Sequence, residues 1–75
     1  MLKVNMLATG LSIKQKCEEF GYTPKKLSDM FDTSTTTPYL WMSGKVMPRL
    51  DFLVTLCKLF NCTMEELLVV DEVDE

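Results

Sequence analysis

Apolar residues recur every three or four positions along most of the chain, and polar turn residues separate one such run from the next. In the first run, Ile13, Cys17 and Phe20 share one helix face at positions i, i+4 and i+7. Thr9 is a good N-cap residue before this run, and Gly21 is the type of residue that commonly ends a helix. The pattern predicts a first helix from Thr9 to Phe20.

The second run begins with a clear start signal. Thr23 can cap a helix, and Pro24 fits the first helical position because a backbone N–H has no helical partner there. Leu27 and Phe31, four positions apart, form the apolar face of the run. We expect this second helix to end near Asp32.

The third run follows a stretch of hydroxyl side chains at residues 33–37, which offers several alternative N-caps. A proline deep in a helix would cost about 3 kcal/mol, whereas the first turn tolerates it. Because Pro38 lies in this run, we expect a short helix that begins late, at Thr36 or Thr37. Gly44 is the natural C-terminal stop.

The fourth run predicts a helix from about Leu50 to Phe60, followed by Asn61 in the left-handed conformation. Its expected apolar stripe consists of Leu50, Leu53, Val54, Cys57 and Phe60. The apolar stripe and the stop signal after it therefore favour a helix.

The fifth run opens with a capping box, in which the side chains of Thr63 and Glu66 each bond the other's backbone N–H. We expect this helix to run to about Leu68 or Val69. Residues 70–75 are mostly acidic and are expected to fray as a tail.

Five short helices with brief connections predict one compact all-α, five-helix domain with its core over residues 9–69. The chain has 75 residues, enough for one hydrophobic core and too few for two. No apolar stretch is long enough to span a membrane, and no signal peptide opens the chain. We therefore expect a soluble, cytoplasmic protein with no membrane partner.

The charge is unevenly distributed. Residues 1–50 hold seven basic and four acidic side chains, a net charge of +3, whereas residues 51–75 hold one basic and seven acidic side chains, a net charge of −6. The overall charge of −3 is therefore a property of the C-terminal third. This asymmetry is compatible with one basic binding face.

Catalytic and metal-binding patterns are missing from the sequence. The three cysteines are scattered and there is no histidine, which disfavours a disulfide framework or a zinc site. We expect Cys17 and Cys57 to be small core residues. Without a glycine-rich phosphate loop or converging carboxylates, we expect no enzyme activity, no cofactor and no metal.

From the second run onward, an ordered set of residues is similar to a known family, and the Trp-x-x-Gly-Lys-x-x-Pro pattern is its most specific part. The set consists of Leu27-Ser28-Asp29-Met30-Phe31, Ser34, Trp41, Gly44-Lys45, Pro48, Leu50, Leu53, Leu56, Phe60, Thr63, Glu66 and Leu67. It resembles the phage-repressor and Cro-like helix-turn-helix family, the XRE family of transcriptional regulators. The resemblance covers roughly residues 11–68.

The resemblance implies a transcriptional regulator that binds double-stranded DNA. Its recognition helix, near residues 35–43, would lie in the major groove. The base-facing positions it implies are Ser34, Thr35, Thr36, Tyr39 and Leu40. The phosphate-contacting positions it implies are Thr23, Lys25, Lys26, Ser43, Lys45 and Arg49. The base-facing set lacks Arg, Asn and Gln, the side chains best able to bond base edges bidentately.

Other interpretations stay open. Residues 33–37 also fit a solvated, capped loop, and Lys25 and Lys26 also fit exposed helix charges. Trp41 falls opposite the hydroxyl face, which favours a core position over stacking on DNA. The acidic total and the uncharged recognition helix fit an alternative function, a helix-turn-helix fold that binds a protein partner without recognising an operator.

One short recognition helix reads too few base pairs to single out a site, and relatives with this fold pair two half-sites. We therefore expect a homodimer. The candidate surface is the fifth helix with its extension, which contains Met64, Leu67, Leu68, Val69 and Val70. The alternative is that Leu67 and one neighbour join the monomer core while the valines fray.

Overall fold

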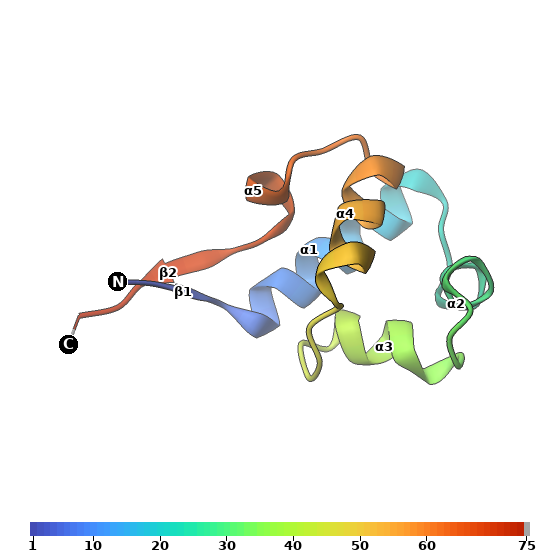
Figure 1. The fold of residues 1–75 in the computed structure, drawn as a ribbon, viewed down its shortest axis with the longest axis horizontal. Helices are drawn as coiled ribbons and strands as arrows, with labels where there is room; N and C mark the ends of the chain where they lie inside the picture. The colour runs from blue at the N-terminus through green and yellow to red at the C-terminus, as the bar shows by residue number, and fades with distance from the viewer. Residues whose placement is uncertain (75) are drawn as a thin grey trace.

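The computed structural model describes residues 1–74, and within them it contains five helices and one two-stranded sheet (Figure 1). The elements in chain order are β1 (Leu2–Val4), α1 (Met6–Phe20), α2 (Pro24–Phe31), α3 (Thr36–Met42), α4 (Leu50–Leu59), α5 (Met64–Leu67) and β2 (Val70–Glu72). The five predicted helices are confirmed, and the small sheet is an addition to the expected all-α architecture. No helix within residues 1–74 combines the length and the apolar character that crossing a membrane requires.

Most helix ends lie where the sequence signals predict them. The Thr23 hydroxyl accepts a hydrogen bond from the Lys26 N–H at 3.1 Å at the start of α2. Gly21 after α1 has φ +76° and Asn61 after α4 has φ +50°, the left-handed conformation that ends a helix. The capping box of α5 is present in full, and the hydrogen bond from the Thr63 N–H is the main cause that lowers the pKa of its glutamate.

The predicted start of α1 is wrong. The helix begins at Met6, because the side chain of Asn5 caps it by accepting a hydrogen bond from the Ala8 N–H at 2.9 Å. Thr9 lies inside the helix, is 1% exposed, and bonds the backbone of Val69 instead. Its hydroxyl donates to the Val69 carbonyl at 3.3 Å and accepts from the Val69 N–H at 3.0 Å.

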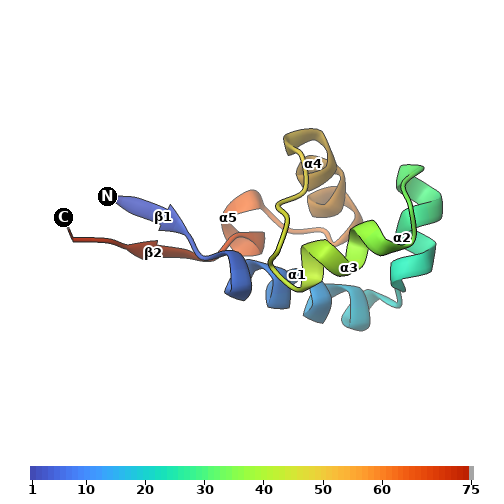
Figure 2. The same ribbon diagram turned by 90° about the horizontal axis from the view of Figure 1, so that it is seen from below.

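The expected frayed tail is also wrong for the part of it that the structure describes, since Glu75 lies outside the described residues. Val70–Glu72 pairs antiparallel with Leu2–Val4, and the Val73 N–H donates to the Met1 carbonyl at 2.8 Å. All residues of both strands are exposed. Figures 1 and 2 show the strands projecting together from one end of the helical body, and we call this pair the terminal ribbon.

The core lies between α1, α2, α3, α4 and α5. Its buried apolar side chains are Ile13, Cys17, Leu27, Trp41, Leu53, Leu56, Phe60 and Leu67. The ring of Phe31 stacks on the ring of Phe52 with 5.2 Å between the ring centroids, and its centroid lies 5.7 Å from that of Trp41. These contacts join α2 and α3 to α4. The core positions predicted for Cys17 and Trp41 are confirmed.

The predicted stripe of α4 is only partly correct. Leu50 and Val54 are 72% and 48% exposed, and Cys57 is half-buried. The buried row runs instead through Leu53, Leu56 and Phe60. Both rows have helical spacing, so periodicity alone does not decide which one faces the core.

Helix α1 lies unusually close to the end of α3 at Gly10. A Cβ atom at this position would lie 2.6 Å from the Met42 carbonyl oxygen and 2.7 Å from that of Trp41. It would also lie 2.8 Å from the backbone nitrogen of Gly44. All three atoms belong to the backbone, so a side chain at Gly10 would push α1 and α3 apart.

We predict that Gly10→Ala destabilises the domain by roughly 1–3 kcal/mol, the usual cost of overpacking. This loss outweighs the gain of about 1 kcal/mol that alanine brings to a helix interior. Gly21→Ala is the control, because no atom lies within 4 Å of its Cβ position and only left-handed strain acts there. Urea unfolding measures the free energy of unfolding of each variant. A Gly10→Ala protein as stable as wild type would contradict the close packing of α1 against α3.

Candidate nucleic-acid interface

Helices α2 and α3 form a helix-turn-helix unit, joined by a tight turn. Asp32 takes the left-handed conformation at φ +54°, and the Thr33 N–H donates to the Ser28 carbonyl at 3.0 Å. Ser28 is buried, and its hydroxyl donates to the Lys25 carbonyl at 2.7 Å. The Thr33–Ser28 backbone hydrogen bond therefore closes the turn, while the Ser28 hydroxyl is satisfied inside α2.

Helix α3 has a buried side and an exposed side. Pro38 occupies the third helical position, within the first turn as predicted, and is buried together with Trp41. Of the five base-facing candidates, only Leu40 is half-buried, and the others (Ser34, Thr35, Thr36 and Tyr39) are exposed. Helical spacing places Thr36, Tyr39 and Leu40 along one side of α3.

The hydroxyl groups before and at the start of α3 differ in their partners. Ser34 Oγ lies 3.1 Å from Thr37 Oγ1, and the Thr33 hydroxyl donates to the Ser34 carbonyl at 3.1 Å. The side chains of Thr35 and Thr36 make no hydrogen bond to any of residues 1–74. Thr35 and Thr36 are therefore the members of the run whose hydroxyls are free for an external partner.

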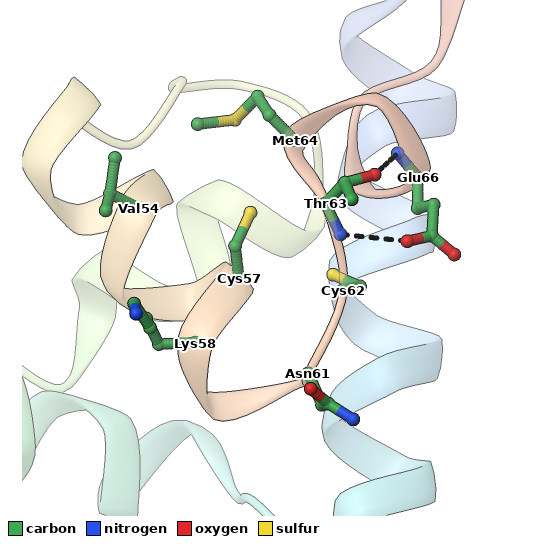
Figure 3. A pocket seen from close by; sticks show the side chains of 8 residues that line it. All are labelled: Val54, Cys57, Lys58, Asn61, Cys62, Thr63, Met64 and Glu66. Atoms are coloured by element: carbon green, nitrogen blue, oxygen red, sulfur yellow. Dashed lines mark hydrogen bonds between the residues drawn. The ribbon is translucent and has the colours of Figure 1, made fainter.

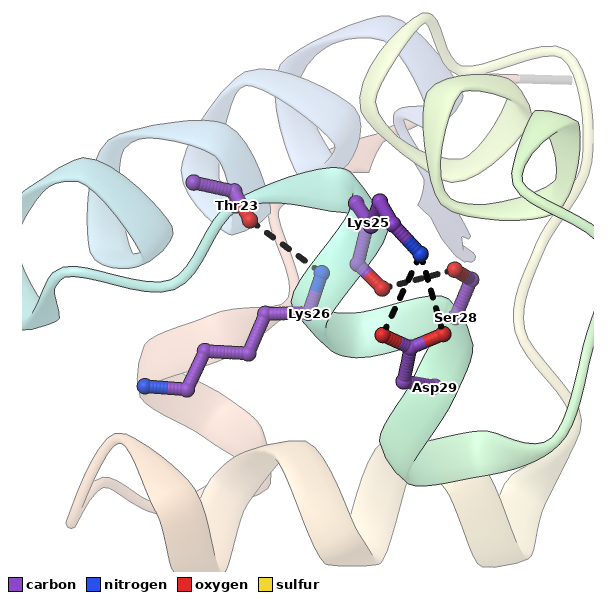
Figure 4. Close-up of polar contacts among 5 residues, drawn as sticks. All are labelled: Thr23, Lys25, Lys26, Ser28 and Asp29. Carbon is purple, nitrogen blue, oxygen red and sulfur yellow. Dashed lines mark hydrogen bonds and ion pairs between the residues drawn. The ribbon is translucent and has the colours of Figure 1, made fainter.

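The start of α2 presents the first group of phosphate candidates (Figure 4). The Lys25 ammonium lies 3.4 Å from the nearer carboxylate oxygen of Asp29, in an exposed pair one helical turn apart. The Lys26 ammonium lies 5.3 Å from the centre of the Tyr22 ring. Exposed pairs of this kind are worth little, so both cations can exchange these partners for a phosphate at small cost.

The loop after α3 presents the second group, formed by Ser43, Lys45 and Arg49. The guanidinium of Arg49 lies 3.1 Å from a carboxylate oxygen of Asp51 and 4.6 Å from the centre of the Phe52 ring. Lys45 is exposed and forms no ion pair with any side chain of residues 1–74. Lys45 is thus the cation of this loop with no internal competitor for a phosphate.

A groove beside α3 was not anticipated from the sequence. It lies between α1, the start of α2 and α3 and has a volume of about 560 Å³. Its largely apolar wall includes Leu7, Leu11, Tyr39 and Met42, and Tyr39 is 60% exposed. Leu7 lies before the predicted start of the first helix, so the sequence analysis had no reason to place it beside α3.

The buried edge of the groove contains a thiol that is shielded from solvent. Burial raises the pKa of Cys17 to about 11, with a smaller contribution from the negative charge of Glu18. Among residues 1–74, no three His, Cys, Asp or Glu side chains gather closely enough to hold a metal ion.

The comparisons with known proteins agree with this geometry. A family model described as a Cro/C1-type HTH DNA-binding domain matches residues 12–72, well over half of the chain. The match includes all of α2, α3, α4, α5 and β2 and most of α1. The search of curated proteins and the search of solved structures each found no match.

Proposed function

The chain belongs to the Cro/C1-type helix-turn-helix DNA-binding family, and we propose that it is a sequence-specific transcriptional regulator that reads the major groove with α3. The observation that carries this proposal is the pair of exposed, unbonded hydroxyls at the start of α3, on Thr35 and Thr36. In this mode of binding the N-terminal residues of the recognition helix contact base edges.

Base reading rests on small polar groups. A threonine hydroxyl can donate to or accept from a base edge, and its methyl group can touch the methyl group of thymine. Tyr39 adds a phenol and Leu40 adds apolar contact further along the same side of α3. Without a bidentate Arg, Asn or Gln among these side chains, each contact discriminates modestly, and α3 reads only a few base pairs.

Phosphate contacts orient the helix on the duplex. Lys45, Arg49 and the Ser43 hydroxyl approach one strand from the loop after α3. Thr23, Lys25 and Lys26 approach the other side from the start of α2. The acidic residues of the terminal ribbon project from one end of the domain, so they do not lie between these two groups (Figure 1).

We further propose that the protein binds DNA as a homodimer through its C-terminal region. Of the residues first considered for this surface, Leu67 is buried in the core and Val69 is bonded to Thr9. What stays exposed is Val70, which pairs with Val4 in the terminal ribbon. Strand alternation places Leu2 and its partner Glu72 on the same face as this pair, so the ribbon offers a second copy three apolar side chains and one carboxylate.

A second candidate function is favoured by the groove beside α3. Its exposed wall of Leu7, Leu11 and Tyr39 would suit the apolar face of a partner helix, and the net charge of −3 weakens non-specific attraction to DNA. The fold would then serve as a protein-interaction module. A DNA affinity that stays flat as salt rises would favour this function over operator binding.

The first prediction concerns phosphate contact by Lys45. Lys45→Ala should weaken binding to all DNA sequences alike and lower the slope of log affinity against log salt by about one unit. Lys58→Ala is the matched control, because this lysine lines the pocket between α4 and α5. Fluorescence anisotropy titrations at several salt concentrations give both slopes, and equal slopes for the two variants would contradict the contact.

The second prediction concerns sequence reading by Thr35 and Thr36. A random pool of duplex oligonucleotides first yields the best-bound sequence. Alanine at both positions should cost roughly 1–3 kcal/mol on that sequence and much less on random DNA. An equal loss on both kinds of DNA would refute base reading. A pool with no enriched sequence would refute operator recognition as a whole.

The third prediction concerns the dimer. Val70→Asp should shift sedimentation equilibrium from dimer to monomer at tens of micromolar, roughly the range in which a small interface still associates. Val54→Asp is a matched control, because Val54 and Val70 are both 48% exposed. A wild-type protein that is monomeric at these concentrations would rule out the dimer. A dimer that tolerates Val70→Asp would place the interface elsewhere.

A further inference from the structure

The turn between α4 and α5 brings two cysteines together. The Cys62 N–H donates to the Cys57 carbonyl at 3.0 Å, and the Asn61 N–H donates to the Lys58 carbonyl at 3.3 Å. With Asn61 at φ +50°, these two bonds form a Schellman motif. In this motif the side chains at the positions of Cys57 and Cys62 commonly touch. The backbone itself therefore holds the two thiols as neighbours.

Both thiols are accessible from the same side. Cys57 and Cys62 are half-buried and line a shallow pocket of about 490 Å³ between α4 and α5. Figure 3 shows Cys57 on α4 and Cys62 on the chain that leads to α5, with the Cys62 sulfur directed toward α4. The capping box of Thr63 and Glu66 follows directly and fixes the chain beyond Cys62. A small reagent in solution can therefore reach a pair of thiols whose backbone is already ordered.

We propose that Cys57 and Cys62 form a modification site, at which a hydroperoxide converts the two thiols into a disulfide within the chain. The third cysteine cannot take part, because Cys17 is buried in the core under the groove beside α3. The inference is independent of DNA binding, since it rests on the turn between α4 and α5 alone.

The reaction proceeds in two balanced steps. The Cys62 thiolate attacks one peroxide oxygen, so that an S–O bond forms, the O–O bond breaks, and hydroxide or alkoxide leaves. The Cys57 sulfur then loses its proton and attacks the Cys62 sulfur, so that the S–S bond forms, the S–O bond breaks and hydroxide leaves. With the two thiol protons, the products are one disulfide and two molecules of water, or water and an alcohol. The thiols are oxidised and the peroxide is reduced.

The surroundings of the pair assign the roles of the two sulfurs. Partial burial raises the pKa of the Cys57 thiol, and the neighbouring Cys62 and the carboxylate of Glu66 raise it further. These effects disfavour the Cys57 thiolate, so we assign the attack on the peroxide to Cys62 and the resolving attack to Cys57. The new bond would close a loop that contains Phe60, whose ring packs in the core against Phe20 and Tyr22.

The test treats the folded protein with hydrogen peroxide, blocks remaining thiols under denaturing conditions, and maps tryptic peptides by mass spectrometry. Trypsin cleaves after Lys58, between the two cysteines, so the disulfide would join two separate peptides. We expect this linked pair as the main oxidised product. Cys17 should carry the blocking reagent, which shows that its thiol was not oxidised. Cys62→Ser should abolish the linked pair.

Thermal unfolding gives a second readout. The disulfide restricts the unfolded chain without moving the turn, so the oxidised protein should melt roughly 10 °C higher than the reduced protein. Cys62→Ser, treated in the same way, should show no such difference. Links between two chains, a link to Cys17, or sulfinic acid at Cys62 without linked peptides would overturn the proposal. A lower melting temperature after oxidation would show that the turn does not match a disulfide.

Discussion

The backbones of α1 and α3 meet at two glycines, and the positions of the other helices follow from that meeting. A side chain at Gly10 would strike the last carbonyl groups of α3, and one at Gly44 would strike the Met6 carbonyl at 2.7 Å. Because each helix approaches the other's backbone directly, α3 can turn its tryptophan inward against α2 and α4. The side that α3 exposes is therefore set by a backbone contact at the end of the helix.

Basic and acidic side chains gather in different parts of the domain. Lys25 and Arg49 form weak, exposed ion pairs with Asp29 and Asp51, and a stronger anion can replace these carboxylates. The terminal ribbon, which projects from one end of the helical body, contains Asp71 and Glu72, and the Asp71 carboxylate accepts a hydrogen bond from the Asn5 side chain at 3.0 Å. An acidic protein can in this way present a surface that is locally suited to nucleic acid, because electrostatic attraction at short range depends on the nearest charges.

Features that depend on neighbouring residues could be predicted from the sequence, and features that depend on residues far apart in the chain could not. The caps of α2 and α5, the early position of Pro38 and the buried position of Trp41 all follow from neighbours within one helical turn. Pairing of Leu2 with Glu72 joins opposite ends of the chain, and strands of three residues carry too little alternation to be recognised. The partner of Thr9 is 60 positions away. The groove beside α3 was missed for the same reason, since it joins side chains of separate helices.

The terminal ribbon also constrains the order in which the elements can pair during synthesis. β1 precedes every helix and β2 follows every helix, so the ladder between them closes only after the whole helical region has been synthesised. A ribosome that stops early leaves a chain with α2 and α3 but with an unpaired first strand, open to proteases and chaperones. Pairing of β1 thus depends on β2, the element that is made after all five helices.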